Sequence, residues 1–367
     1  MEIASAGPWI TDTEVRYVED AARNGWYKNW NGYIDKFEKA FADYTESEYS
    51  ISTSSCTGAI HIALRALGIG PGDEVIVPET TWIATVSSVS LLGATPVFVD
   101  VEADTWCMDP KAFEAAITKN TKAVIPVHMY GHPADMISIV KTAHKSGVFV
   151  LEDAAPGIGS KIDGKPTGSF GDAAVFSFQG AKPLVTGEGG ILVTSNREFY
   201  EKCYYYWDHC REKGKVLFNS DIGYKYKMPN ICAALGLAQL ERADEIIGKR
   251  RQIFFWYQDA LKDFEGIQLN VERDGFFNNF YVPTLILQES AKVTQQEMMD
   301  RLDSLKIGNR PFFRCLSKLP MYTAAETPVA DLLAYRGINL PCSTMMTEAE
   351  TYYVSGKVKE ILKSGGN

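Results

Sequence analysis

The sequence has no long hydrophobic run and no excess of basic charge. None of its 367 residues lies in a stretch that approaches the roughly 20 consecutive apolar residues of a membrane-spanning helix. The 46 acidic residues outnumber the 37 Lys and Arg residues, and the net charge of −9 argues against nucleic acid as the main partner. The first residues, MEIASAGPWITDTEV, lack a basic segment followed by an apolar one, so no signal peptide is expected. We therefore expect a globular protein with no nucleic-acid or membrane partner.

Paired cysteines and a dinucleotide fingerprint are also missing. The seven cysteines are odd in number and scattered, and no two of them form a C-x-x-C pair. Reduced thiols in a cytoplasm explain this better than a disulfide framework or a zinc site, so no bound metal is expected. No G-x-G-x-x-G run follows a strand-like segment, which argues against a nicotinamide dehydrogenase.

Strand-like and helix-like segments alternate from about residue 50 to residue 195. The strand-like runs include DEVIVP, TPVFVD, TKAVIPVH and VFVLED, and the helical patterns between them include TGAIHIALRALG and PADMISIVKTAHKSG. Asp109 followed by Pro110 is typical of a helix start, so we expect a helix over DPKAFEAAIT. Such alternation predicts an α/β fold whose mostly parallel sheet is covered by helices.

The last third of the chain has a different pattern. A long helical stretch begins near Pro229 and continues to about residue 264, and the extended segments IQLNV and FYVPTLILQ follow it. Thr294 and Glu297 have the spacing of a capping box at the start of another helix, and GINLP is typical of a short strand. This mixture indicates a second, smaller α+β unit.

The length of the chain also favours two domains over one large core. We expect a large α/β domain over residues 26–245 and a smaller α+β domain over residues 246–367. Residues 1–25 are expected to pack on the smaller domain.

Polar and aromatic side chains gather where the predicted strands end, which is where α/β sheets bind ligands. Asp153 closes VFVLED, and His128 closes KAVIPVH with Tyr130 shortly after it. The hydroxyl-rich segment STSSCTG precedes a helix whose N-terminus could bind an anion, and Trp82 lies at the start of the next helix. Each residue also has a simpler interpretation: Asp153 as a cap, His128 as a hydrogen-bonded structural residue, Trp82 as a core or interface aromatic.

One lysine stands between two strand-like runs, in AVFSFQGAKPLVTGEGGILV. Because burying an ammonium ion is costly, Lys182 either lies on an exposed loop tip or supplies its amine to a site. An amine, an acid, an aromatic face and an anion-binding helix start at one sheet edge together meet the needs of pyridoxal phosphate. The sequence therefore predicts a site for this cofactor.

The same segments resemble those of the DegT/StrS-type sugar aminotransferases. The resemblance covers nearly the whole chain, in the order CTGAIHIALRALGIGPGDEVIVPETTWIATVSSVSLLGATPVFVDV, KAVIPVHMYGHPADM, VLEDAAPGIGS, GSFGDAAVFSFQGAKPLVTGEGGILVT, IGYKYKMPNICAALGLAQLE and GINLP. It implies the fold of aspartate aminotransferase, fold type I of the pyridoxal-phosphate enzymes. Within the family, the chain is most similar to enzymes that move an amino group from glutamate to carbon 4 of a GDP-linked 4-keto-6-deoxy sugar, as in the synthesis of lipopolysaccharide O-antigen.

The resemblance also implies the roles of individual residues. Lys182 would form the Schiff base, Asp153 would pair with the pyridine nitrogen, and Trp82 would stack on the ring. Four residues are implied at the cofactor's phosphate, namely Cys56, Thr57, Ser177 and Asn230. Asn230 would act from the neighbouring subunit, which implies a homodimer with shared active sites. Contacts to the sugar or its diphosphate are expected from His128, Tyr130 and Arg310, the last of which has a simpler interpretation as a surface arginine.

Two positions depart from the family pattern. Cys56 replaces a usual glycine, so the approach of the backbone to the phosphate could differ. Pro156 stands where a polar residue often contacts the cofactor's ring hydroxyl or the reacting centre, and proline offers neither a polar side chain nor an N–H. Cofactor tuning or substrate preference could differ as a result.

Several alternatives stay open at this point. Amination at carbon 3 and the use of dTDP- or UDP-linked sugars share these motifs. A sugar dehydratase of the family would carry a histidine where this chain has Lys182. A non-catalytic regulator would be expected to have lost the lysine, the acid or the glycine-rich turn, and all three are present.

Overall fold

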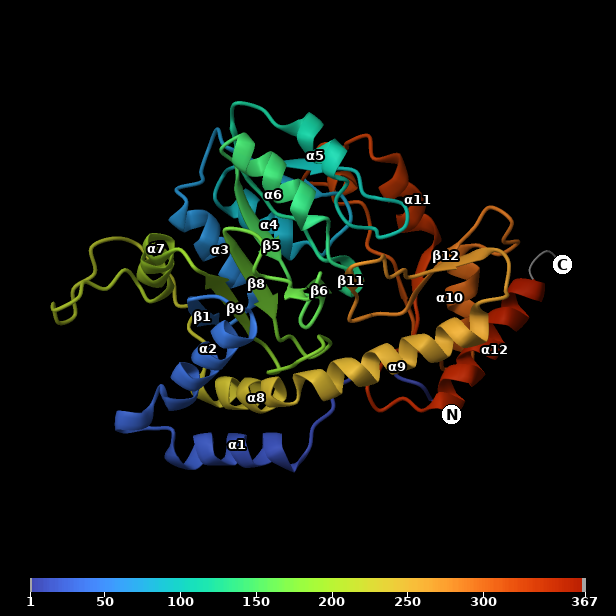
Figure 1. Ribbon diagram of the computed structural model, residues 1–367, viewed down its shortest axis with the longest axis horizontal. Helices are drawn as coiled ribbons and strands as arrows, with labels where there is room; N and C mark the ends of the chain where they lie inside the picture. The colour runs from blue at the N-terminus through green and yellow to red at the C-terminus, as the bar shows by residue number, and fades with distance from the viewer. Residues whose placement is uncertain (1, 365–367) are drawn as a thin grey trace.

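In the computed structural model of the protein, which describes residues 2–364, seven strands form a central sheet in the order β1-β9-β8-β5-β4-β2-β3 (Figure 1). Their bounds are β1 (Tyr49–Thr53), β2 (Glu74–Pro78), β3 (Thr95–Val99), β4 (Thr121–Val124), β5 (Phe149–Asp153), β8 (Ala173–Ser177) and β9 (Gly190–Thr194). Only β9 is antiparallel to its neighbours, β1 and β8. The predicted α/β fold with a mostly parallel sheet is confirmed.

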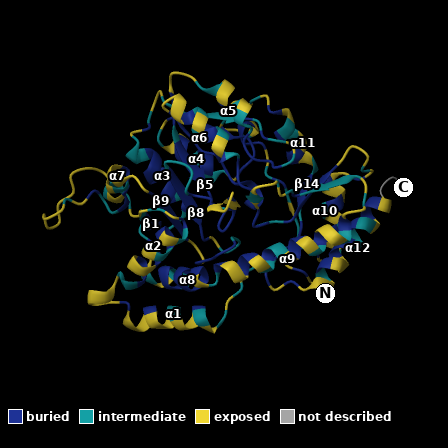
Figure 2. Cartoon of the chain, viewed as in Figure 1, coloured by how far each residue is buried: buried dark blue, intermediate teal, exposed yellow. Residues whose placement is uncertain are grey.

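Helices cover both faces of this sheet because its strands are apolar on both sides. In β8, Val175 packs with the side chains of α3 and α7, whereas Ala174 and Phe176 pack with those of α2 and α8. Figure 2 shows the strands buried between helices whose outer faces are exposed. The helices around the sheet are α2 (Gly32–Tyr44), α3 (Cys56–Ala66), α4 (Ala84–Leu91), α5 (Pro110–Ala116), α6 (Met136–Lys145), α7 (Arg197–Trp207) and α8 (Asn230–Glu241).

The helix starts predicted from capping residues are confirmed. The Asp109 side chain accepts a hydrogen bond from the Lys111 N–H (2.9 Å), and Pro110 is the first residue of α5. Thr294 and Glu297 form both bonds of a capping box at α10 (Gln295–Ser304). Each cap satisfies N–H groups that have no partner within the helix.

A second, antiparallel sheet builds the smaller unit, in the order β10-β12-β14-β13. Its strands are β10 (Ile267–Leu269), β12 (Thr284–Leu287), β13 (Arg310–Pro311) and β14 (Gly337–Asn339). A separate apolar core joins this sheet to α9 (Ala243–Leu261), α10 and α12 (Glu348–Ser364). The other elements are α1 (Asp12–Asn24), α11 (Pro328–Arg336), β6 (Lys161–Ile162), β7 (Lys165–Pro166), β11 (Phe276–Phe277), η1 (Tyr27–Asn29), η2 (Met129–Gly131) and η3 (Leu316–Lys318).

The long helical stretch of the sequence is two helices rather than one. It divides at Arg242, whose φ of −111° and ψ of 15° are not helical, into α8 and the 19-residue α9. The two helices follow one another along one side of the molecule, and α9 runs from the central sheet to the smaller unit (Figure 1). No helix in the described part of the chain combines the length and hydropathy that crossing a membrane requires.

The N-terminal segment contacts both units. Ile3 donates its N–H to the Lys306 carbonyl (3.0 Å), and the Cys342 N–H donates to the Ser5 carbonyl (2.9 Å), so these first residues lie on the smaller unit. The helix α1, however, lies against α8 (Figure 1). The expectation that the whole of residues 1–25 packs on the smaller domain is therefore corrected for α1.

A buried carboxylate fixes α1 in this position. Glu14 is 1% exposed, and its oxygens accept hydrogen bonds from the Thr11 N–H (2.8 Å), Gln239 Nε2 (2.7 Å) and Arg242 Nη1 (2.7 Å). Burial alone would raise the pKa of Glu14, but the bonds from Thr11 and Arg242 outweigh burial and lower that pKa to about 2. The ionised carboxylate thus ties α1 to the junction of α8 and α9.

We expect Glu14→Ala to lower the free energy of unfolding by about 1–3 kcal/mol, because the variant removes the acceptor for bonds from Thr11, Gln239 and Arg242, while Arg242 keeps its ion pair with Glu245. The stabilisation depends on an ionised Glu14, so it is present above the ordinary carboxyl pKa of 4.5 and is lost as the pH falls towards about 2. Urea unfolding from pH 7 to pH 3 should show the difference from wild type shrinking below pH 4.5. Glu19→Ala on the exposed face of α1 is the control and should change little.

Candidate active site

Asp153 lies at the carboxyl end of β5 and is 4% exposed. Its Oδ2 accepts a hydrogen bond from the Thr85 hydroxyl (2.7 Å), and its Oδ1 accepts one from the Ala155 N–H (3.1 Å). Thr85 is in the first turn of α4, three residues after Trp82. The carboxylate is therefore held in one orientation beside the start of α4.

The start of α3 lies next to this carboxylate. Ser55 caps the helix by accepting the Gly58 N–H (3.1 Å), and no residue in the range 2–364 accepts a hydrogen bond from the N–H of Cys56 or Thr57. These free N–H groups at a helix N-terminus suit an anion such as a phosphate. Burial raises the pKa of the Cys56 thiol well above its ordinary value. The Ser88 hydroxyl of α4 donates to the Thr57 carbonyl (3.3 Å), which joins the start of α3 to the helix that holds Asp153.

The glycine-rich turn allows β9 to come close to the start of α3. Ser177 ends β8, is 6% exposed and pairs across the strands with Gly190, the first residue of β9. A Cβ atom on Gly190 would collide with the backbone nitrogen of Cys56. The α3 start and Ser177 thus meet at one edge of the sheet, and the helix forms normally with Cys56 at the glycine position.

Lys182 lies in the segment that joins β8 to β9 and is half-buried. Its Nζ is 4.8 Å from the ring centroid of Tyr281, and its carbonyl accepts a hydrogen bond from Arg250. The Gly180 N–H donates to the Gly187 carbonyl (3.0 Å) and closes the segment at its base. The amine is thus held at the same end of the sheet as Asp153.

Trp82 leaves much of its indole ring uncovered. Its exposed fraction is 62%, and its ring contact is with Phe313, at a centroid distance of 6.3 Å. Large aromatic rings are seldom this exposed without a partner. An open indole, a buried carboxylate, an amine and free N–H groups at a helix start fit a flat, phosphorylated pyridine cofactor.

Two of the predicted substrate contacts are buried. His128 is 0% exposed; its Nδ1 accepts the Ala134 N–H (3.1 Å), so its Nε2 carries the proton and donates to Glu152 Oε2 (3.0 Å). Tyr130 is 2% exposed, stacks on Phe313 and bonds through its hydroxyl to Asn339. Both ring nitrogens of His128 are occupied, so a substrate contact from it stays a prediction that this geometry does not support.

Arg310 is exposed at the start of β13 and pairs through its backbone with Asn339 of β14. Asn339 also contacts the Tyr130 hydroxyl, so Arg310 lies near the aromatic side chains of the site. Its contact with a diphosphate or a carboxylate stays a prediction.

Asn230 is the first residue of α8 and is bonded within its own chain. Its Oδ1 accepts the N–H groups of Tyr33 (2.9 Å) and Ile34 (3.3 Å), so it caps α2 in place of Asn31, whose side chain makes no capping bond. Its Nδ2 is buried without a partner in the described structure. A contact from Asn230 to the cofactor in a partner subunit stays a prediction.

The sequence did not reveal several residues that complete the site. Thr85 holds Asp153, Tyr281 lies beneath the Lys182 amine, and Phe313 packs against Trp82. Only Thr85 had a visible signal, since it follows Trp82 by about one helical turn. The other two come from the smaller unit, far from their partners in the sequence.

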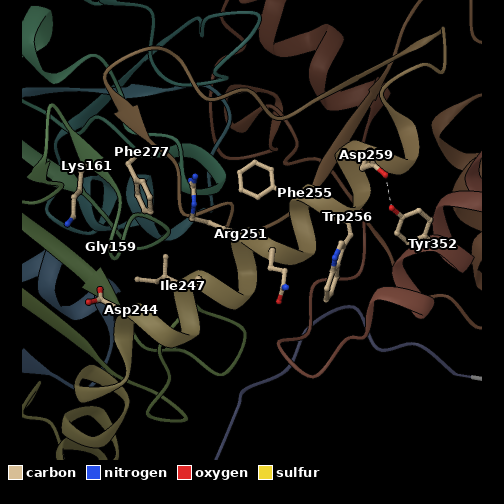
Figure 3. A pocket seen from close by; sticks show the side chains of 12 residues that line it. Gly159, Lys161, Asp244, Ile247, Arg251, Phe255, Trp256, Asp259, Phe277 and Tyr352 are labelled. Atoms are coloured by element: carbon tan, nitrogen blue, oxygen red, sulfur yellow. Dashed lines mark hydrogen bonds between the residues drawn. The ribbon is translucent and has the colours of Figure 1, made fainter.

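A groove lies elsewhere, along α9 (Figure 3). Its volume is about 710 Å³, and none of the residues placed around Lys182 lines it. It is lined by Gly159, Lys161, Asp244, Ile247, Gly248, Arg251, Gln252, Phe255, Trp256, Asp259, Phe277 and Tyr352. Within residues 2–364, no cluster of three His, Cys, Asp or Glu side chains is arranged to hold a metal.

The sequence profile of the DegT/DnrJ/EryC1/StrS aminotransferase family matches residues 8–359, so the chain belongs to this family. The GDP-perosamine synthase of Escherichia coli O157:H7 is 38% identical over 355 residues, which cover 96% of each chain. The GDP-perosamine synthase of Caulobacter vibrioides is 37% identical over 365 residues, or 98% of each chain. A Streptococcus pneumoniae protein assigned as a sugar aminotransferase, solved in its PLP form, matches with a TM-score of 0.93 at 27% identity, covering 100% of both chains.

The protein is therefore an enzyme, a sugar aminotransferase that uses pyridoxal phosphate. When bound, the cofactor supplies an electron sink for chemistry at an amine-bearing carbon.

Proposed function

We propose that this enzyme transfers an amino group from glutamate to carbon 4 of a GDP-linked 4-keto-6-deoxy sugar, as a GDP-perosamine synthase. The observation that carries the proposal is the identity of 37–38% to two GDP-perosamine synthases over nearly the full length of each chain. A nucleotide-sugar substrate also suits the exposed guanidinium of Arg310, which can bind a diphosphate through paired hydrogen bonds.

We assign four roles within this proposal. Lys182 carries the cofactor and, once its amine is released, moves a proton at the reacting carbon. Asp153 holds the proton on the pyridine nitrogen, because a buried carboxylate favours a cation beside it. Trp82 covers one face of the cofactor ring. The phosphate contacts come from the start of α3 and from Ser177.

A panel of keto sugars tests the substrate. Purified enzyme is incubated with glutamate and with GDP-, dTDP- or UDP-linked 4-keto and 3-keto sugars, and the formation of 2-oxoglutarate is measured. The GDP-linked 4-keto-6-deoxy sugar should give the highest kcat/KM. A preference for a dTDP or UDP sugar, or amination at carbon 3, would overturn the substrate while leaving the reaction class in place. A sugar dehydratase is disfavoured because Lys182 is present.

We further propose that the working unit is a homodimer with shared sites. The segment between α7 and α8 projects from the molecule (Figure 1), and it exposes Val216 (91%), Leu217 (98%) and Ile222 (83%). Apolar side chains this exposed are typical of a surface that another chain covers. To bond a partner's phosphate, Asn230 would have to turn its buried, unpartnered Nδ2 outward.

Mixing two variants with complementary defects, at a cofactor concentration too low to load Asn230→Ala, tests the shared site. Asn230→Ala should lose roughly ten- to a hundredfold in cofactor affinity, the scale of one hydrogen bond to a charged group. If Asn230 acts across the dimer, a mixed dimer with Lys182→Ala contains one site with both defects and one with neither, so activity should partly return. Activity no higher than the weighted activity of the two unmixed variants would contradict the shared site. It would show that Asn230 and Lys182 of one chain serve the same site, or that Asn230 only caps α2.

We place the enzyme in the cytoplasm as part of the same proposal. All seven cysteines are unpaired, which suits a reducing compartment.

A further inference from the structure

A buried arginine holds the carbonyl of the cofactor-bearing lysine. Arg250, in the middle of α9, is 1% exposed. Its Nη2 donates to the Lys182 carbonyl (3.1 Å), and its Nη1 donates to the carbonyls of Tyr281 (3.2 Å) and Cys342 (3.4 Å). One guanidinium therefore joins the lysine segment of the large domain to two segments of the smaller unit.

The charge of Arg250 has no carboxylate partner in the described part of the chain. The neighbouring arginines differ, since Arg242 pairs with Glu14 and Arg251 pairs with Glu272. The Nε of Arg250 is also buried without a hydrogen bond. Burying a cation without a counter-charge is costly, and carbonyl oxygens offset only part of that cost. Packing alone therefore does not account for a buried cation at this position.

Two of the three carbonyls that Arg250 binds belong to Lys182 and Tyr281. The Lys182 amine lies over the ring of Tyr281, with 4.8 Å between Nζ and the ring centroid. Arg250 bonds the backbone of both of these residues, so it fixes the lysine and the surface beneath its amine relative to each other. The planar fork of arginine can bind acceptors on several segments at once, which a lysine ammonium cannot do with the same geometry.

We propose that Arg250 is a positioning residue for the aminotransferase reaction, one that holds the Lys182 backbone so that its amine meets the cofactor. The proposal rests on the assignment of Lys182 as the cofactor-bearing lysine. Displacing a reacting group by about 1 Å can cost roughly 10²-fold in rate, so loss of this contact should be visible in turnover.

The test compares Arg250→Met and Arg250→Lys with the matched control Arg251→Met in the cofactor-loaded enzyme. Borohydride fixes the cofactor wherever it is attached, and peptide mass spectrometry gives the fraction of bound cofactor on Lys182. Arg250→Met should lower that fraction severalfold and lower kcat by roughly 10- to 100-fold, with KM for glutamate changed much less. Added guanidinium ion should restore part of the lost attachment and kcat. Arg250→Lys should have intermediate values of both, and Arg251→Met should have the wild-type values.

A melting temperature that falls while the attached fraction and kcat stay at wild-type values would show a merely structural role and overturn the proposal. If Arg250→Met does not fold, Arg250→Lys decides the question, and wild-type attachment in that variant overturns the proposal as well. If the wild-type enzyme itself shows no cofactor on Lys182, the assignment of that lysine fails, and the positioning role fails with it.

Discussion

Replacing Lys182 with alanine is expected to abolish measurable transamination, with a loss of roughly 10³-fold or more in kcat. The variant removes the amine that lies at the same edge of the sheet as Asp153 and the α3 start, and with it the group assigned to carry the cofactor and move the proton at the reacting carbon. It should still bind the cofactor through its phosphate, since the N–H groups of Cys56 and Thr57 and the Ser177 hydroxyl are untouched. Equilibrium dialysis and a coupled assay for 2-oxoglutarate measure the two properties separately.

Lys161→Ala is the control for this variant. Lys161 is an exposed lysine on β6 that lines the groove along α9, away from the site. Its loss should leave both cofactor attachment and turnover unchanged. Borohydride labelling of a lysine other than 182 in the wild-type enzyme, or substantial turnover by Lys182→Ala, would show that the amine has been assigned wrongly.

Asp153→Asn is expected to keep the fold and lose about 10²-fold or more in kcat, the scale of removing one preorganised electrostatic partner. Asparagine has the same shape and can still accept the Thr85 hydroxyl, but it lacks the charge that keeps the pyridine nitrogen protonated. Steady-state kinetics report the loss, and circular dichroism reports the fold.

Asp172→Asn provides the matched control for the aspartate. Asp172 lies just before β8, at the opposite end of the strands, where it accepts a hydrogen bond from the Val150 N–H (2.8 Å). This variant should lose stability rather than turnover. A near wild-type kcat in Asp153→Asn would contradict this role and would show that Asp153 only orients the turn after β5.

Most of the central sheet could be read from the sequence because its signals are local. Apolar strands separated by amphipathic helices, and caps such as Asp109 and Thr294, depend on residues a few positions apart. The break at Arg242 could not be predicted, because no glycine or proline marks it. It coincides with a contact between the Arg242 side chain and Glu14, which is 228 residues away in the sequence. The position of α1 was misjudged for the same reason.

The same difference between local and distant signals separates the site residues that could be predicted from those that could not. Asp153 ends β5, Thr57 lies in the first turn of α3 and Lys182 lies in the segment after β8, and topology alone brings such positions to one edge of a sheet. His128 follows β4 on the same side of the sheet, yet Glu152, the residue before Asp153, holds it in the core. Whether a polar side chain faces the site or the interior depends on its partners, and those partners are not visible in the local pattern.

The direction of β9 has a consequence for how activity should emerge during folding. Because β8 and β9 are antiparallel neighbours, with Ser177 opposite Gly190, the lysine segment leaves and re-enters the sheet at one edge. A slip of this pairing by one residue would exchange the side chains that pack on α3 and α7 with those that pack on α2 and α8. A slip by two would displace one strand by roughly 7 Å and change the length of the segment that carries Lys182. A refolding chain with full helix content but a slipped pairing of β8 and β9 would thus have no activity. The moment at which turnover returns during refolding therefore reports when these two strands pair in the native register.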